Sequence, residues 1–440
     1  MVSRLPKALH LVGGRPLITY ALDLAKLCSD VDPTVIVGHG EQALRQTIGR
    51  AANLVVQDQQ LGTGHALLQA ADSLRTKAEL ILVWAADMPL LHVDTLTSVV
   101  ARQRENMGPL SMVTVVADDA RGFGRVVRDD EEGCVRTVVE QDHLTDKQRV
   151  IREMNVGVYC FEANWLWAQL PDILPSLNGE YYLTDLVGTA ANQGHAIGTI
   201  MITDESEAIG VNTRVHLAQA ENALRERVNR DWMERGVTIT DSATTYIESG
   251  VTIGQDTTIL PNTHLLGQTM VGEGCVIGPN SVVRDTTMAS RCRVECSVLD
   301  HAVLENDVHV GPFGHLRRGA YLDEGVHMGN FGEVKNSRLG PGVKIGHFSY
   351  IGDASVGART NIGAGTITCN FGMDKKKHKT EIGQDAYIGS DSLLVAPVTV
   401  GRRSHTGAGA VVTKDVPDDS LVVGAPARVI KREEPPHTDE

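Results

Sequence analysis

Aromatic side chains and patterned cysteines are scarce in this sequence, and each scarcity restricts the fold. Only six Phe and four Trp occur among 440 residues, against 44 Gly. A core built on aromatic rings is therefore not expected, whereas a coil packed with small residues fits this composition. The seven Cys form no C-x-x-C pair, and Cys292 and Cys296 are the closest two. An odd, unpatterned set indicates reduced thiols in a cytosolic protein and not a disulfide framework.

Basic residues and long apolar runs are also scarce. Lys and Arg number 41 against 55 Asp and Glu, so the formal net charge is −14. This balance argues against a nucleic-acid-binding surface, although a local basic pocket still suits a small anionic substrate. No apolar run approaches the ~18 residues of a membrane span, and no signal peptide is recognised. We therefore expect a cytoplasmic protein with no nucleic-acid partner and no membrane span.

An apolar residue recurs at six-residue spacing in the C-terminal half, with Thr406 as one polar exception. The repeating residues are Ile382, Ile388, Leu394, Val400 and Val412 and, earlier, with one five-residue step, Ile345, Ile351, Val356 and Ile362. A three-sided coil gives this period, because each short face supplies one inward residue. Gly follows most of these residues, and we expect it to permit a tight corner with positive φ. A β-sandwich with glycine turns is the alternative, and the sustained spacing argues against it.

Residues 1–212 instead alternate short apolar strands with amphipathic helices. The expected strands are Thr34–Val37, Leu80–Ala85, Ser111–Val116 and Val156–Phe161, and the expected helices are Leu17–Cys28, His65–Leu74 and Thr95–Arg104. Such alternation predicts a mostly parallel sheet covered by helices, an α/β fold of Rossmann-like type with ligands at the carboxyl ends of its strands. Asp87 follows one such strand, where a carboxylate can hold a hard cation; a turn or N-cap Asp is the plainer alternative.

A helical pattern over Arg214–Arg235 connects the two halves, and Gly236 is placed to end it. Its apolar stripe consists of Leu217, Ala220, Leu224, Val228 and Trp232. The chain length suits two or three domains. The predicted parts are an α/β domain over 1–212, a linker helix over 213–236, a β-solenoid over 237–432 and a disordered tail over 433–440.

Five segments carry a resemblance to a known family. They are Leu5-Pro6-Lys7-Ala8-Leu9-His10, Gln60-Leu61-Gly62-Thr63-Gly64-His65-Ala66, Gly179-Glu180-Tyr181-Tyr182-Leu183-Thr184-Asp185, Gly210-Val211-Asn212-Thr213-Arg214 and Gly363-Ala364-Gly365-Thr366-Ile367-Thr368-Cys369-Asn370. The first four resemble sugar-1-phosphate nucleotidyltransferases. With the helix and the coil added, nearly the whole chain resembles the bacterial bifunctional enzymes that join a glucosamine-1-phosphate N-acetyltransferase to an N-acetylglucosamine-1-phosphate uridylyltransferase.

This resemblance implies a fold, two reactions and an assembly. The fold is a Rossmann-like nucleotidyltransferase domain, a linker helix and a left-handed parallel β-helix of hexapeptide repeats, assembled as a homotrimer. The enzyme would acetylate glucosamine 1-phosphate with acetyl-CoA. It would then transfer UMP from UTP to N-acetylglucosamine 1-phosphate with the help of Mg²⁺, giving pyrophosphate and UDP-N-acetylglucosamine for the cell wall. In the second reaction, positioning and charge stabilisation would dominate over covalent chemistry.

The resemblance also assigns the nucleotidyl site. Asp87 and Asn212 would hold Mg²⁺ through oxygen, and Lys7 would lie near the phosphates. The uracil and ribose would be read by Gln57, Gly62 and Thr63, and the N-acetylglucosamine moiety would be held by Gly124, Glu140 and Asn155, with Tyr182 and Thr184 close by. Taken alone, Gly62-Thr63-Gly64 would read as an ordinary turn before a helix.

The acetyltransferase site follows in the same way. His347 would be the general base, a role that suits an imidazole at neutral pH, and Glu333 would orient it. Taken alone, a single His is more often structural or on the surface. The acceptor sugar phosphate would be bound by Arg317, Lys335, Tyr350 and Asn361, and acetyl-CoA by Ala364, Asn370, Phe371, Ser390 and Ala408. The run Lys375–Lys379 reads as a solvated excursion, with attraction of CoA phosphates as its functional alternative.

Several positions depart from the family pattern. The family opens with a strand and a loop reading G-x-G-T-R-M, whereas this sequence begins Met1-Val2-Ser3-Arg4. Either the start was placed at an internal Met, or the chain is truncated and its uridylyl site is disabled, because such loops wrap phosphates with backbone N–H groups. Ala86 replaces the usual Gly before Asp87, Phe371 replaces a Tyr, Arg318 replaces a Pro, and the CoA-gripping Arg has only Arg428 as a possible counterpart.

Three other functions therefore stay open at this stage. The chain could be an acetyltransferase with a decayed N-terminal domain, which the missing loop and Ala85-Ala86 favour. It could be a non-catalytic regulatory or scaffold protein with two domains, against which Lys335, His347 and Tyr350 argue. It could also be a nucleotidyltransferase of different specificity, such as one making ADP-glucose.

Overall fold

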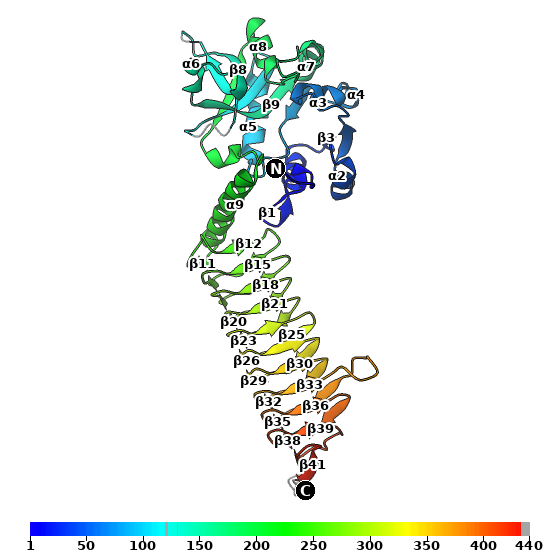
Figure 1. Ribbon diagram of the computed structural model, residues 1–440. Coiled ribbons are helices and arrows are strands. Elements are labelled where there is room, and N and C mark those ends of the chain that lie inside the picture. The colour runs from blue at the N-terminus through cyan, green and yellow to red at the C-terminus, as the bar shows by residue number, and fades with distance from the viewer. Residues whose placement is uncertain (119–121, 130, 433–440) are drawn as a thin grey trace. The chain divides into compact units, whose positions relative to one another are not determined.

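The computed structural model describes residues 1–118, 122–129 and 131–432 and divides into two compact units (Figure 1). One unit comprises Met1–Leu224, and the other begins at Arg225. Helix α9 (Arg214–Glu234) contributes to both cores, since Ala220 is buried in the first unit and Trp232 packs against the core of the second. Within the described residues, no helix is both long and apolar enough to cross a lipid bilayer.

The N-terminal unit is built on a six-stranded sheet in the order β10-β6-β9-β7-β8, with β5 paired to β9. Its strands are β5 (Leu80–Val83), β6 (Leu110–Val116), β7 (Arg125–Arg128), β8 (Val135–Val139), β9 (Glu153–Glu162) and β10 (Ile197–Ile202). All four strands expected from the sequence exist. The prediction of a mostly parallel sheet is wrong, because β9 runs antiparallel to β5, β6 and β7 and only β10 pairs in parallel, with β6.

The helices of this unit agree closely with the sequence pattern. They are α1 (Leu17–Cys28), α2 (Glu41–Ile48), α3 (Thr63–Gln69), α4 (Ala71–Leu74), α5 (Val93–Glu105), α6 (Asp146–Arg149), α7 (Ala163–Gln169) and α8 (Asp185–Asn192). The apolar stripe of α1 is buried through Leu17, Ile18 and Leu22. The expected single helix His65–Leu74 is divided between α3 and α4 at Ala70.

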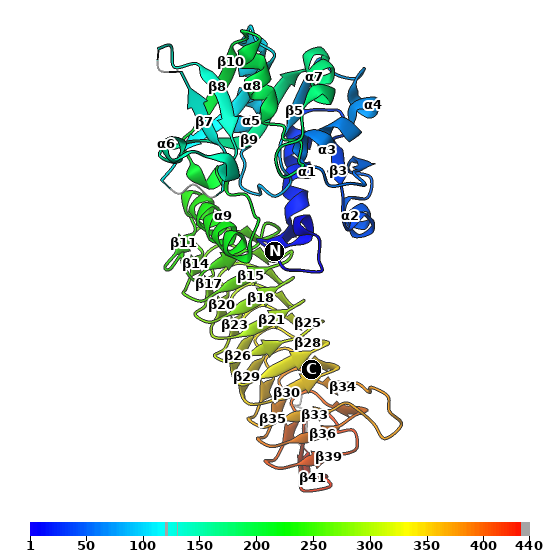
Figure 2. The same cartoon turned by 45° about the horizontal axis from the view of Figure 1, so that its top comes forward.

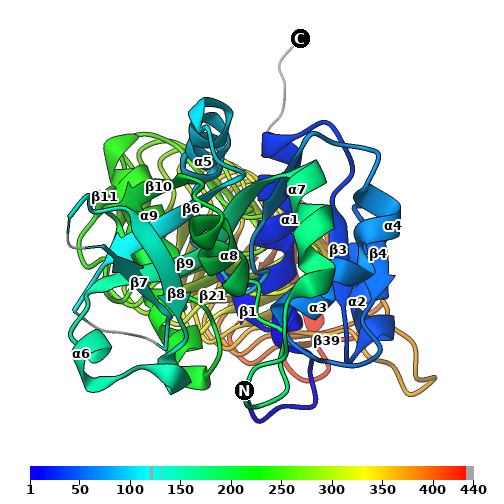
Figure 3. The same cartoon turned by 90° about the horizontal axis from the view of Figure 1, so that it is seen from above.

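A large cavity separates two strand edges in this unit. Strands β3 (Thr34–Val37) and β4 (Asn53–Val56) form a parallel pair of their own, and Figure 3 shows them apart from β6 and β9. In the described part of the chain β3 pairs only with β4, and β5 only with β9. The free edges of both strands line one cavity of about 1650 Å³, together with apolar residues of α1 such as Leu22 and Ala25. A short hairpin, β1 (Leu11–Val12) with β2 (Arg15–Pro16), precedes α1.

The second unit is a parallel β-helix whose short strands form three sheets, here called the first, second and third faces (Figure 1). The first face contains β11 (Thr238–Ile239), β14 (Thr258–Ile259), β17 (Val276–Ile277), β20 (Arg293–Val294), β23 (His309–Val310), β26 (His327–Asn330), β29 (Lys344–His347), β32 (Asn361–Ile362), β35 (Tyr387–Ile388), β38 (His405–Thr406), β40 (Ser420–Val423) and β41 (Arg428–Arg432). The second contains β12 (Tyr246–Ile247), β15 (His264–Leu266), β18 (Val282–Arg284), β21 (Val298–Asp300), β24 (His315–Leu316), β27 (Glu333–Lys335), β30 (Tyr350–Gly352), β33 (Ile367–Cys369), β36 (Leu393–Val395) and β39 (Val411–Val412). The third contains β13 (Thr252–Ile253), β16 (Met270–Val271), β19 (Thr287–Met288), β22 (Val303–Leu304), β25 (Ala320–Leu322), β28 (Ser337–Leu339), β31 (Ala354–Val356), β34 (Thr380–Ile382) and β37 (Val398–Val400).

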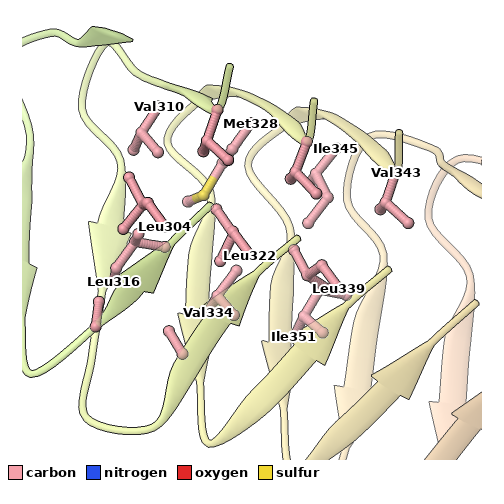
Figure 4. Packing of buried hydrophobic residues seen from close by; sticks show 14 of the residues in the cluster. Leu304, Val310, Leu316, Leu322, Met328, Val334, Leu339, Val343, Ile345 and Ile351 are labelled. Atoms are coloured by element: carbon pink, nitrogen blue, oxygen red, sulfur yellow. The ribbon is translucent and has the colours of Figure 1, made fainter. Parts of the chain in front are cut away.

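The six-residue spacing sets the core of the coil, as predicted. Leu304, Val310 and Leu316 come from the three faces in turn and point inward, and the next coil repeats the arrangement (Figure 4). The polar exception Thr406 is also buried, at 2 % exposure. Its hydroxyl accepts a hydrogen bond from Gly389 N at 2.9 Å and lies 2.7 Å from the hydroxyl of Ser392. A polar residue is therefore tolerated in the core because its oxygen is satisfied there.

The role predicted for the repeated glycines is wrong. Gly383, Gly389 and Gly407 do not have positive φ; the left-handed residues stand two positions later, as at Asp385 (φ 59°) and Asp391 (φ 58°). The glycines are needed because successive coils approach closely. A Cβ on Gly389 would lie 2.5 Å from Thr406 O in the following coil, and one on Gly383 would lie 2.6 Å from Arg402 N. Even one methyl group there would force the backbones apart.

One segment leaves the coil between β33 and β34 and projects beyond the faces (Figure 2). It contains the run Lys375–Lys379, whose lysines are exposed. The prediction of a solvated excursion is confirmed. The chain re-enters the coil at Thr380, whose register partner on the preceding coil is Ala354.

Adding one methyl group at Gly389 tests the close approach of the coils. Gly389→Ala is expected to destabilise the C-terminal unit by about 1–3 kcal/mol, as overpacking does, and to lower its melting temperature. Gly346→Ala is the matched control, because a Cβ there meets nothing within 4 Å and its φ is not positive. The measurement is thermal unfolding followed by circular dichroism. Equal melting temperatures for the two variants would contradict this account of the glycines.

Candidate functional site

The 1650 Å³ cavity of the N-terminal unit brings together most of the residues predicted for the nucleotidyl site. Its walls include Thr63, Asp87, Gly124, Glu140, Asn155 and Asn212, and also Thr184. Lys7 does not line the cavity but reaches two residues that do, and Gln57 lies behind Gly62, where its Nε2 donates to Gly62 O at 3.1 Å. The hydroxyl of Tyr182 points elsewhere and accepts from Asn178 Nδ2 at 2.6 Å. Residues up to 149 positions apart in the sequence thus face one space.

Asp87 and Asn212 share one cation in this structure. The Lys7 ammonium forms an ion pair with the Asp87 carboxylate and donates to Asn212 Oδ1 at 2.8 Å. Val211 N donates to Asp87 O at 2.9 Å, so backbone pairing holds the two oxygen-bearing residues side by side. A carboxylate with an amide oxygen, here around an ammonium, is a donor set that suits Mg²⁺. These residues therefore fit the predicted metal.

The turn at Gly62 is fixed by the segment that carries Tyr181. Gly62 has φ 97°, and a Cβ on it would lie 2.7 Å from Tyr181 O. Gly64 N donates to that same oxygen at 2.8 Å, and Thr63 Oγ1 accepts from Leu183 N at 3.0 Å. Because α3 begins at Thr63, this residue belongs both to the turn before the helix and to the cavity wall. The predicted contact with a base stays a prediction.

A polar cluster lies deeper in the same cleft. Thr184 Oγ1 donates to Glu140 Oε1 at 2.7 Å, and burial raises the pKa of Glu140, partly opposed by that hydrogen bond. Asn155 Nδ2 donates to the hydroxyl of Tyr159 at 2.6 Å, and Asn155 N donates to Gly124 O at 3.0 Å. Tyr159 was missed by the sequence analysis, because it lies within an apolar strand and reads as core. The cluster contains both hydrogen-bond donors and acceptors along the cavity wall.

In the C-terminal unit, part of the predicted acceptor site gathers on the second face. Arg317, Lys335 and Tyr350 come from successive coils, since Arg317 N donates to Val334 O and Glu333 is the register partner of Tyr350. Asn370 joins them: it is 5 % exposed, and its Nδ2 lies 3.3 Å from the hydroxyl of Tyr350. Two cationic side chains beside a phenol suit a sugar phosphate.

Four other predicted residues form a column along the corner between the first and second faces. They are His347, Ala364, Ser390 and Ala408, one from each successive coil. Gly365 N donates to His347 O at 3.3 Å, Asp391 N to Ala364 O at 2.6 Å, and Gly409 N to Ser390 O at 2.8 Å. The side chains that follow His347 along this corner are all small.

Two predicted residues lie outside these groups. Asn361 stands on the first face, between its register partners Lys344 and Tyr387. Phe371 begins the projecting segment, is 60 % exposed, and has the ammonium of Lys377 5.3 Å from its ring centre. Neither is brought into contact with His347 by any interaction within the described residues.

The prediction that Glu333 orients the imidazole of His347 is wrong. Glu333 binds Arg317, with Arg317 Nη1 donating to Glu333 Oε1 at 2.8 Å. The His347 ring instead makes a short hydrogen bond between its Nδ1 and Asn330 Oδ1. A signal was present in the sequence, because Asn330 and His347 are 17 positions apart and one coil of this repeat has about that length.

Comparisons with known proteins agree with this division. Residues 1–158 match the family of MobA-like NTP transferase domains, 250–285 match the bacterial transferase hexapeptide with six repeats, and 379–414 match the hexapeptide repeat of succinyl-transferase. The fold and the two groups of residues thus define a bifunctional transferase, with a nucleotidyltransferase domain followed by a hexapeptide-repeat transferase domain.

The chain belongs to the family of bifunctional GlmU proteins. It is 42 % identical to that of Heliobacterium modesticaldum over 424 residues, which cover 96 % of this chain and 92 % of the relative. It is 39 % identical to that of Halalkalibacterium halodurans, with 98 % and 95 % covered. It is also 39 % identical to that of Brevibacillus brevis, with 98 % and 93 % covered.

The raised pKa of Glu140 predicts a pH-dependent effect of Glu140→Gln. Because the folded-state pKa lies above the unfolded one, the stability contributed by Glu140 is complete below the unfolded pKa and is lost as pH rises through the folded pKa. Gln keeps the acceptor for Thr184 but never ionises. The variant is therefore expected to gain melting temperature over the parent between pH 4 and pH 8. A constant or falling difference across that range, in thermal unfolding, would contradict the burial argument.

Proposed function

We propose that this chain acetylates glucosamine 1-phosphate with acetyl-CoA and then transfers UMP from UTP to N-acetylglucosamine 1-phosphate. Two observations carry the proposal: within the first unit Asp87 and Asn212 meet at one cation, and within the second unit a column of small residues follows His347. The first group suits phosphoryl chemistry and the second suits acyl transfer to an amine. Membership of the bifunctional GlmU family supports the pairing of these two reactions.

In the uridylyl reaction the chain mainly positions two anionic substrates. A phosphate oxygen of the sugar phosphate attacks the α-phosphorus of UTP in line, and pyrophosphate leaves. Asp87 and Asn212 would hold Mg²⁺, which would supply neutralising charge to the phosphates when bound. Lys7, whose ammonium contacts Asp87 and Asn212, would offer a positive charge to the phosphates. Glu140 and Asn155 orient the sugar ring through hydrogen bonds.

In the acetyl reaction His347 acts as general base. The amine nitrogen attacks the thioester carbonyl while Nε2 takes a proton from it; the C–S bond then breaks and the CoA thiolate leaves. Arg317 and Lys335 hold the phosphate of the sugar and keep the amine in place. The small residues Ala364, Ser390 and Ala408 would leave room for the pantetheine arm. Asn361 and Phe371 would complete the acceptor and CoA subsites in the assembled protein.

We propose a homotrimer for the assembled protein. The faces of the β-helix expose apolar side chains, such as Val298 (45 %) and Ile367 (40 %) on the second face and Met270 (50 %) on the third. Three copies around a threefold axis would cover such faces, and a neighbouring copy would supply groups that the acetyl site lacks in one chain. The seven free cysteines suit a cytoplasmic location.

A second candidate, an acetyltransferase without uridylyl activity, is favoured by one observation. Within the described residues, the edges of β3 and β5 that line the cavity have no strand paired between them. The two candidates differ only in UMP transfer, and the experiments below separate them.

Exchanging one residue at each site is expected to abolish one reaction and spare the other. His347→Ala should lower acetyl transfer by about 10²–10⁴-fold, the usual contribution of general base catalysis, and leave UMP transfer unchanged. Asp87→Ala should lower UMP transfer by about 10²-fold or more, because a metal ligand supports charge stabilisation worth several kcal/mol. Free-thiol release and pyrophosphate release measure the two reactions. Loss of both activities in either variant, with the fold intact, would contradict two separate sites.

An upstream extension tests whether the unpaired edges of β3 and β5 limit UMP transfer. Placing a strand and a G-x-G-T-R loop before Met1 is expected to raise UMP transfer and to leave acetyl transfer unchanged, since the loop supplies N–H donors to phosphates. An extension of equal length made of Gly and Ser is the control. Pyrophosphate release is compared for the three proteins. Full activity of the 440-residue chain, unaltered by the extension, would remove the second candidate and the proposed role of the loop.

A further inference from the structure

Asn330 and His347 occupy equivalent places on successive coils. Asn330 ends β26, His347 ends β29, and the two are register partners on the first face. Their side chains meet through the short hydrogen bond between Asn330 Oδ1 and His347 Nδ1. The backbone adds a second link, since Phe348 N donates to Asn330 O at 3.0 Å. Both the ring and the backbone of His347 are thus held by the preceding coil.

The chemistry of this bond selects one form of the imidazole. A carbonyl oxygen only accepts, so Nδ1 carries the hydrogen, and the lone pair of the neutral ring is on Nε2. Throughout residues 1–118, 122–129 and 131–432, no group forms a hydrogen bond with Nε2. The His347 side chain is exposed at the corner that carries the column, so a substrate can reach it there.

Among the described residues, no charged side chain forms a hydrogen bond with the His347 imidazole in place of Asn330. The ionisable groups on the strands packed beside β29 are His327 on β26, Tyr350 on β30, and Glu333 and Lys335 on β27. Glu333 is engaged with Arg317, and β32 carries no ionisable group. In the described part of the chain none of these groups forms a hydrogen bond with the imidazole. The amide of Asn330 is therefore the group that determines its orientation.

We propose that Asn330 is the positioning residue of the acetyltransferase site, whose side-chain carbonyl fixes the Nδ1-protonated form of His347 and aims Nε2 at the substrate amine. This inference rests on the proposed role of His347 as general base. It adds a residue that touches neither substrate and acts only through the imidazole.

The inference predicts different outcomes for two substitutions. Asn330→Ala removes the acceptor, so kcat for acetyl transfer should fall by up to about 100-fold, as misplacement of a reacting group can cause, with the KM for glucosamine 1-phosphate unchanged. Asn330→Asp keeps an acceptor at Nδ1 and should restore most of kcat at high pH. Its carboxylate favours the imidazolium, so the acidic limb of the kcat–pH profile should move to higher pH.

Asn306→Ala is the matched control. Asn306 also makes one hydrogen bond between successive coils, accepting from Ser290 N at 3.0 Å, and it lies outside both sites. It should leave kcat and the pH profile unaltered, and UMP transfer should be the same in all three variants. Melting temperatures measured alongside show whether each variant is folded.

Three results would overturn the inference. They are a parental kcat and pH profile in Asn330→Ala, an unshifted acidic limb in Asn330→Asp, or equal losses in Asn330→Ala and Asn306→Ala. Failure of the underlying assignment would look different. If His347→Ala retains acetyl transfer, the general base is wrong whatever Asn330 does. If His347→Ala is inactive while Asn330→Ala is fully active, only the positioning role falls.

Discussion

The close stacking of one coil on the next is the constraint on which the C-terminal unit depends. Parallel strands lie about 4.8 Å apart across a sheet, so every residue has a counterpart directly above and below it. This spacing buries the apolar column, and it excludes a Cβ at Gly383 and Gly389. It also brings residues about 17 positions apart into contact, and both groups of the acetyl site are built in this way.

Much of this architecture could be predicted, because the signals are local. The six-residue period identified the coil, and the helical pattern over Leu17–Cys28 gave the bounds of α1. The failures concern relations between segments. The antiparallel course of β9 depends on how distant strands pair, and no local pattern records it. The glycines were assigned to turns because positive φ is their usual reason, while the close approach of Arg402 N or Thr406 O becomes visible only in space.

The candidate site divides in the same manner. Most of the residues named through the family resemblance gather as expected, because each was identified by its place in a sequence motif. Tyr159 and Asn330 were missed for different reasons. Tyr159 lies in an apolar strand and shows its hydroxyl only when that strand is placed beside Asn155. Asn330 contacts His347 from the preceding coil. Glu333 lies nearer to His347 in the sequence but forms an ion pair with Arg317 instead.

The excursion between β33 and β34 shows how such a protein accommodates changes in length. Register partners across it are 26 positions apart, as for Ala354 and Thr380, whereas partners elsewhere, such as Asn330 and His347, are 17 apart. The extra residues leave at a corner and return to the same register, so the sheets continue without a fault. Insertions at corners are therefore nearly neutral for stability, while a single insertion within a strand would shift every inward residue. Changes in the length of this loop can thus alter the surface near Phe371 and leave the solenoid itself unchanged.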